Sequence, residues 1–122
     1  MFAYFDRGIY MSRFEFLKKE DQELYRRCRL TEEAVKSEVL MSRVQQALEY
    51  MVGELGASGS VLSEDIAELR DSGVLDNKMG KLFRKVHMVT DAGIQGRDKR
   101  ISSVDELFAK DALLEIATWY QG

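Results

Sequence analysis

The stretch that decides the fold is EVLMSRVQQALEYMVGEL, residues 38–55. Its apolar side chains recur every three or four residues, which places them on one face of a helix. These positions are Leu40, Val44, Ala47, Leu48, Met51, Val52 and Leu55. Gly56 follows directly, and glycine is the residue that most often closes a helix. The stretch therefore predicts a long amphipathic helix that buries one face against other elements.

The segment before this helix predicts a turn and then another helix. Ser12 is expected to cap a short turn, with Glu15 three residues later as in a capping box. The helix after it is expected at about residues 20–37, because apolar side chains continue there on a loosely helical period. These side chains are Phe14, Leu17, Leu24, Cys28, Ala34 and Val35.

Three further helices follow, each with a helix-start signal. Ser63 is the expected N-cap of the first, Asp76 or Asn77 starts the second, and Ser102 or Ser103 caps the last. The side chains expected to face the core are Ile66, Leu69, Met79, Leu82, Phe83, Val86, Val89, Val104, Leu107, Phe108, Leu113, Ile116, Ala117 and Tyr120. No segment alternates apolar and polar residues long enough to predict a strand. The sequence therefore predicts an all-α bundle of about five helices.

Length and composition predict one ordinary globular domain. The chain has 122 residues, of which 45% are hydrophobic and 32% charged, a balance typical of folded proteins. Its net charge of −3 excludes a generally basic nucleic-acid coat. We expect the domain at residues 12–122, since a second methionine opens it at Met11. Residues 1–11 are then an extension, either a loose arm or a short strand at FAYF.

The chain has one cysteine and one histidine, which limits the disulfides and metal sites that it can form. With only Cys28 and His87 in the chain, an intrachain disulfide is excluded and a zinc site is not expected. Cys28 falls on the apolar period, so it is interpreted as a small buried hydrophobe. The methionines near apolar stripes are interpreted as core fillers, and they are Met41, Met51, Met79 and Met88. No apolar run is long enough to cross a membrane, and the first residues lack the basic start and continuous apolar run of a signal peptide. The single cysteine favours a reducing cytoplasm, and no metal or cofactor is expected.

The order of five phrases resembles a known helical module. The phrases are FEFLKKEDQELYRRCRLTEEAV, SRVQQALEYMVGEL, LSEDIAELRDSGVL, LFRKVHMVTDAGIQG and ALLEIATWY, which together cover about residues 12–120. The module lies near the N-terminus of type I restriction enzyme R subunits and related helicases, and it belongs to the HEPN superfamily. The resemblance implies a HEPN-like bundle in a phage-defence or mobile-element setting. It also implies a homodimer paired through the last helices, with Phe108, Trp119 and Tyr120 as expected contacts.

The polar motif of that family is altered in this chain. The family pattern LRxLGNxxxH aligns His87 with the arginine, Thr90 with the glycine, Asp91 with the asparagine and Gln95 with the histidine. Glutamine does not titrate, and an aspartate adds negative charge where the phosphate of an RNA substrate would lie. Arg84 with His87, three residues apart on one helix, is the remaining pair for catalysis. We expect Arg84, His87, Asp91 and Gln95 to form a ligand-binding or regulatory surface rather than a catalytic one.

A second candidate surface is basic. Its residues are Lys78, Lys81, Arg84, Lys85, Arg97, Lys99 and Arg100. Clustered lysines and arginines bind phosphates, but the same pattern is also typical of a solvated helix face. Interleaved aromatic residues, which single-stranded nucleic acid would need for stacking, are missing from this segment.

The sequence therefore favours a non-catalytic interaction or oligomerisation module, expected as a homodimer or bound to a protein partner. Two other functions stay open: a nucleic-acid-contacting accessory domain, and a degenerate HEPN-type ribonuclease that uses Arg84 and His87.

Overall fold

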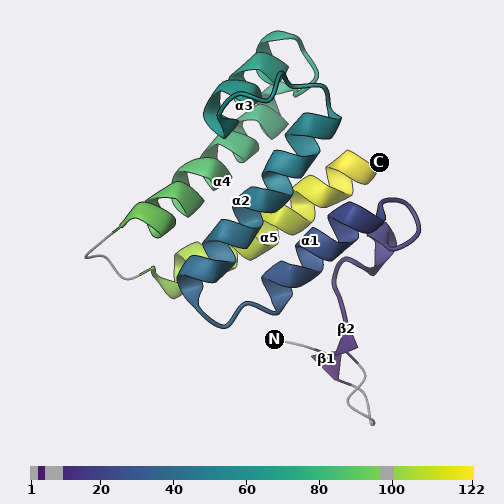
Figure 1. The fold of residues 1–122 in the computed structure, drawn as a ribbon, viewed down its shortest axis with the longest axis vertical. Coiled ribbons are helices and arrows are strands. Elements are labelled where there is room, and N and C mark those ends of the chain that lie inside the picture. Colours follow the sequence, from purple (N-terminus) through teal and green to yellow (C-terminus); the bar gives the residue numbers. More distant parts are fainter. Residues whose placement is uncertain (1–2, 5–9, 97–100) are drawn as a thin grey trace.

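Five α-helices form a bundle (Figure 1) in the computed structural model, which describes residues 3–4, 10–96 and 101–122. The helices are α1 (Gln22–Glu32), α2 (Ser37–Glu54), α3 (Leu62–Asp71), α4 (Asn77–Gln95) and α5 (Ser103–Gln121). The prediction of an all-α bundle of about five helices is confirmed.

Helix α2 is the centre of the bundle. It contacts each of the other four helices, and Figure 1 shows it in front of α5, with α1 and α4 on its two sides. Its predicted stripe is buried, and Met41, Val44, Leu48 and Met51 are fully inaccessible to solvent. Each such side chain stabilises the fold by about 1.5–3 kcal/mol relative to an exposed one. The stretch that predicts the fold thus supplies much of the core.

Helix caps explain where several helices begin. Asp76 and Ser102, each one of two expected caps, accept a hydrogen bond from the backbone N–H three residues further on, at 2.8 and 3.0 Å. Asp21 caps α1 in the same way at 3.0 Å. Gly56 follows the end of α2 with a φ of 102°, a conformation that glycine adopts without strain. A cap of this kind typically contributes about 1 kcal/mol.

Helix α1 is shorter than predicted. It ends at Glu32 instead of continuing to about residue 37, and the side chain of Val35 is 97% exposed. The chain leaves the helix here because α2 turns back to pack along α1. A hydrogen bond of 2.6 Å from Arg43 Nη1 to the carbonyl of Leu30 joins the two helices beside this turn.

The predicted start of α3 is also wrong. Val61 occupies the N-cap position without a side-chain cap bond, and Ser63 lies exposed within the first turn. Instead, the carboxylate of Asp65 accepts the backbone N–H of Ser60 at 3.1 Å. This bond holds the preceding loop against α3, so the helix begins at Leu62 without a serine cap.

The capping box predicted at Ser12 is not formed. The Ser12 hydroxyl accepts the backbone N–H of Phe14 at 3.0 Å and donates to a carboxylate oxygen of Glu32 at 2.6 Å. A short 3₁₀ helix, η1 (Glu15–Leu17), follows it. Ser12 therefore ties the start of the domain to the end of α1.

Three apolar residues predicted to face the core are exposed. Val104 is 74% exposed, Leu107 59% and Met88 58%. Spacing identifies one face of a helix but not how far its neighbours extend over that face, and here the start of α5 is left partly uncovered. Further along α5, Leu113 and Ile116 are buried as predicted. The other methionines interpreted as core fillers, Met41, Met51 and Met79, are also buried.

Two short strands precede the bundle. β1 (Ala3–Tyr4) pairs antiparallel with β2 (Tyr10–Met11), in a register that places Ala3 opposite Met11. Figure 1 shows this pair below α1, apart from the helices. The sequence predicts either a loose arm or a short strand for this extension, and the backbone forms the short strand. The division of the chain at residue 11 stays a prediction.

Candidate functional site

Helix α4 carries the altered family motif and presents its polar residues on two flanks. Its buried face holds Met79, Phe83, Val86 and Thr90 at helical spacing. The Thr90 hydroxyl donates to the carbonyl of Val86 at 2.8 Å, so this buried polar side chain is satisfied within the helix. One flank of α4 packs beside α3 and the other beside α5.

A groove of about 360 Å³ lies on the α3 side of α4, and we call it the α3–α4 groove. Arg84 and His87 line it from α4, and Arg70 lines it from α3. The complete lining is Ser63, Ile66, Ala67, Arg70, Arg84, His87 and Met88. The structure thus places the predicted Arg84–His87 pair in one groove and adds a second guanidinium.

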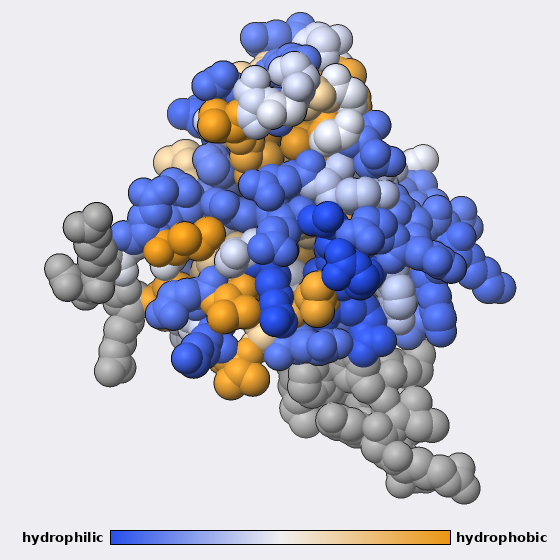
Figure 2. Space-filling view, viewed as in Figure 1, coloured by the Kyte–Doolittle hydropathy of each residue, from blue (hydrophilic) through white to orange (hydrophobic). Residues whose placement is uncertain are grey.

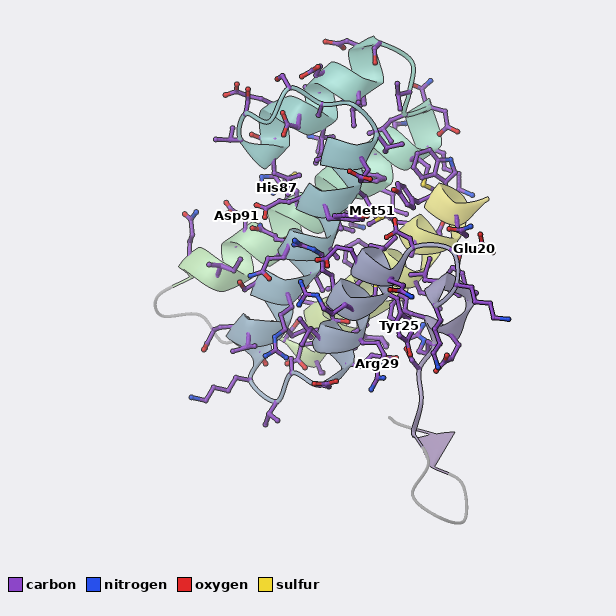
Figure 3. All side chains as sticks on the ribbon, turned by 45° about the vertical axis from the view of Figure 1, so that its right-hand side comes forward. Glu20, Tyr25, Arg29, Met51, His87 and Asp91 are labelled. Atoms are coloured by element: carbon purple, nitrogen blue, oxygen red, sulfur yellow. The ribbon has the colours of Figure 1, made fainter. Side chains whose placement is uncertain are left out.

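Asp91 and Gln95 continue the motif beyond this groove. The Gln95 side-chain amide donates to the Asp91 carboxylate at 3.1 Å, one turn apart along α4. Figure 3 shows His87 and Asp91 on the same side of the helix. Among the described residues, however, the groove lining includes neither Asp91 nor Gln95. Of the four residues expected to form a ligand-binding or regulatory surface, Arg84 and His87 therefore line the groove, and Asp91 and Gln95 bond to each other.

His87 lies half-buried between α2 and the groove. Gln45 Nε2, on α2, is 3.5 Å from His87 Nδ1, at the outer limit of a hydrogen bond. The donor and acceptor roles in this contact depend on the tautomer of the imidazole, and the contact places His87 against α2.

Arg70 and Met88 were not predicted as site residues. Arg70 reaches the groove because the backbone of α4 comes close at Gly80: a Cβ atom added there would lie 2.7 Å from Arg70 Cγ. Met88 was interpreted as a core residue, but it lies open on the rim. Gly80, an isolated glycine within a helical pattern, was the one available signal of a close approach between helices.

The predicted basic residues of α4 line a different groove. Lys78, Lys81 and Lys85 lie on the α5 side, in an open depression of about 550 Å³ that we call the α4–α5 groove. Lys78 Nζ is 3.9 Å from a carboxylate oxygen of Glu115, and Lys85 Nζ is 5.0 Å from the centre of the Phe108 ring. Arg97, Lys99 and Arg100 lie outside the described residues.

The predicted dimer contacts of α5 have partners inside the chain. Trp119 is half-buried with its ring edge-to-face against Phe83, their centres 6.0 Å apart. The Tyr120 hydroxyl lies 3.5 Å from the Asp21 carboxylate, and the Phe108 ring lies beneath Lys85. The exposed large apolar side chains on α5 are instead Val104 and Leu107, near its start.

Asp21 also binds a second tyrosine. The Tyr50 hydroxyl donates to this carboxylate, with oxygen–oxygen distances of 2.8 and 3.0 Å. Burial, and then this hydrogen bond, raise the pKa of Tyr50 above its usual value. Burial likewise raises the pKa of the Cys28 thiol, which is fully inaccessible as predicted. These groups stabilise the packing of α1 against its neighbours.

Neither the described part of the chain nor comparison with known proteins identifies a metal site, a membrane-spanning helix or a family. In the described part of the chain, no three His, Cys, Asp or Glu side chains are grouped to hold a metal ion, and no helix has the length and apolar character to cross a membrane. Comparison with protein-family models, curated proteins and solved structures found no match to this chain. The resemblance to HEPN domains therefore stays a prediction from sequence.

Proposed function

We propose that this chain is a non-catalytic helical interaction module that associates with a second copy of itself through one end of the bundle. The observation that carries the proposal is a set of exposed aliphatic side chains at that end, where α2 begins, α4 ends and α5 begins. We call this set the apolar end, and its members are Val35, Ile94, Val104 and Leu107. Apolar surface that a monomer leaves open commonly marks a protein–protein contact.

Contacts between the elements support the grouping of these side chains. Ser37, the first residue of α2, donates a hydrogen bond to Glu106 in the first turn of α5. At the end of α4, a Cβ atom added to Gly93 would lie 2.9 Å from Met41 of α2 and 3.2 Å from Ile101. Figure 1 shows these helix ends together at the lower left, and Figure 2 shows hydrophobic residues interrupting the hydrophilic surface there.

The HEPN resemblance is consistent with such a module. HEPN-like bundles pair through their last helices, and α5 contributes Val104 and Leu107 to the apolar end. We place the contact nearer the start of α5 than the predicted Phe108, Trp119 and Tyr120, since those side chains already pack within the chain. A cytoplasmic phage-defence or mobile-element system remains the proposed setting.

The α4–α5 groove supports nucleic-acid contact as the second candidate. Lys78, Lys81 and Lys85 line one side of α4, and lysines at such spacing bind phosphates. Glu115 lies within the same groove and opposes a phosphate backbone. We therefore rank this function second.

Ribonuclease activity is the third candidate. Arg84 and His87 share the α3–α4 groove, so a cation for the phosphate and one proton-transfer group lie together. RNA cleavage by acid–base chemistry uses a base for the 2′-hydroxyl and an acid for the leaving oxygen. Among the described lining residues of this groove, His87 is the single histidine and none is a carboxylate, so a second acid–base group is missing there.

One experiment separates the three functions. Purified chain is measured by light scattering after size exclusion, and then titrated with labelled single-stranded RNA and duplex DNA at low and moderate salt. The interaction module predicts a concentration-dependent dimer, no salt-sensitive nucleic-acid binding and full-length RNA after incubation. Steep salt dependence would support the nucleic-acid function instead. RNA shortened by the wild type and spared by His87→Ala would support the ribonuclease.

A further inference from the structure

The α3–α4 groove combines positive charge with an apolar floor, and it lies apart from the apolar end. We infer that this groove binds an acidic segment of a partner protein, in which an Asp or Glu stands next to an apolar residue. The inference rests on the proposed function only in treating the bundle as a binding module. It concerns a different surface and a partner other than a second copy.

The positive charge of the groove is not neutralised by its neighbours. Within the described residues, the guanidinium groups of Arg70 and Arg84 form no hydrogen bond or ion pair. Arginine guanidinium groups bind carboxylates with two parallel hydrogen bonds. Two of them in one groove, beside the His87 imidazole, therefore favour a carboxylate-bearing ligand.

Two acidic residues of α3 bond to the loop before that helix. The Glu68 carboxylate accepts the backbone N–H and the hydroxyl of Ser58, at 3.1 and 2.9 Å. Asp65 accepts the backbone N–H of Ser60, as described above. These carboxylates hold the loop before α3, and within the described residues neither forms an ion pair with the two arginines.

Gly80 positions one of the arginines. The Cγ and Cδ atoms of Arg70 would lie 2.7 and 2.8 Å from a Cβ at Gly80, so the aliphatic stem rests directly on the α4 backbone. A stem packed in this way loses less side-chain entropy when its guanidinium binds a ligand. The groove is thus partly prepared for an anionic group before binding.

The apolar residues of the groove indicate what stands next to the carboxylate in the ligand. Ile66 is buried at its base, and Met88 is exposed beside Arg84. A free inorganic anion would leave Met88 open to water, whereas a carboxylate with an adjacent aliphatic side chain would cover both features. Methionine adapts its shape to apolar partners, which suits a peptide of variable sequence.

A nucleic acid fits this groove less well. No aromatic side chain is among its described lining residues, so bases would have no ring to stack on. Glu64 and Asp71 are exposed on α3. Their negative charges oppose a long polyanion near α3 more than a short segment with one or two carboxylates.

The test uses labelled peptides and matched charge reversals on α4. The probe is a fluorescent peptide in which pairs of glutamates alternate with leucines, and its control replaces every glutamate with glutamine. Arg84→Glu reverses a charge in the groove, whereas Lys78→Glu makes an equal change in charge in the α4–α5 groove. We expect Arg84→Glu to weaken binding of the glutamate peptide by about tenfold or more, and Lys78→Glu by no more than about twofold.

Two additional variants change the groove without adding a negative charge. Arg84→Gln removes the charge without adding a repulsive one, and Gly80→Ala displaces the Arg70 stem; both should also weaken peptide binding. The inference is overturned if the glutamine peptide binds equally well, or if Lys78→Glu and Arg84→Glu cause equal losses. It is also overturned if single-stranded RNA binds more tightly than the peptide and is the ligand that Arg84→Glu releases. A dimer seen by light scattering alongside any of these results would leave the proposed function intact.

Discussion

Arg70 lies across Gly80 where α3 packs against α4. A Cβ atom at Gly80 would stand 2.7 Å from Arg70 Cγ, closer than two such atoms approach in proteins. Gly80 is buried within α4, where glycine otherwise costs about 0.5–1 kcal/mol relative to alanine. The missing side chain therefore allows the close contact that holds Arg70 at the groove.

This contact predicts different responses at two helical glycines. Gly53→Ala, in α2, adds a methyl group to open space and should stabilise the fold by about 0.5–1 kcal/mol. Gly80→Ala gains the same helix propensity but crowds Arg70, at a cost of about 1–3 kcal/mol. We expect a net loss of stability for Gly80→Ala, measured by urea unfolding.

The reason for that loss can be tested with Arg70→Ala. In this background the crowding is gone, so Gly80→Ala should become stabilising by about 0.5–1 kcal/mol. Equal effects of the Gly80 substitution with and without the Arg70 side chain would show that the two residues are not coupled.

The raised pKa of Tyr50 predicts that the fold loses stability at alkaline pH. Because its pKa is raised in the folded state, folding holds the phenol proton more tightly than the unfolded chain does. The stabilisation is complete below the usual tyrosine pKa of about 10 and is lost as the pH rises above it. Tyr120 shifts in the same direction, also through burial first.

We expect the free energy of unfolding to fall above about pH 10, with a shallower fall in Tyr50→Phe. Urea titrations at a series of pH values measure both slopes. Tyr25→Phe is the control, since its hydroxyl contacts Glu15 rather than Asp21. An unchanged slope in Tyr50→Phe would contradict the assignment.

Cys28 should be unreactive in the native protein. Its side chain is inaccessible and burial raises the pKa of its thiol, so the reactive thiolate is rare in the folded state. Ellman's reagent should modify Cys28 only as the protein unfolds in urea. Modification of the native protein at the rate of a free thiol would show that α1 opens readily.

Helical spacing predicts the interior of this fold better than its edges. The stripe from Leu40 to Val52 is buried as its spacing requires, because α2 has neighbours along its whole length. Val104 and Leu107 follow the same kind of pattern, yet they are exposed because neighbouring helices leave this side of the start of α5 uncovered. Where one helix ends relative to another depends on tertiary packing, and spacing carries no information about it.

The candidate site could be predicted only in part, for a related reason. Arg84 and His87 lie one turn apart on one helix, so their proximity follows from spacing alone. Arg70 joins them from α3 through the contact at Gly80, which depends on how the two helices pack. Sequence could indicate a close approach at Gly80 but not its partner.

Two matched substitutions test most directly whether the apolar end mediates self-association. Leu107 and Val61 are both 59% exposed, but Val61 lies beyond the end of α2, away from the apolar end. Leu107→Glu and Val61→Glu therefore place the same charge on surfaces of equal exposure. Each variant is compared with the wild type by light scattering across a range of concentrations, after circular dichroism confirms its helical content.

We predict that the wild type and Val61→Glu reach the mass of two chains as concentration rises, while Leu107→Glu stays at the mass of one. A wild type that remains a single chain at every concentration would contradict the account, as would a dimer that Leu107→Glu leaves intact.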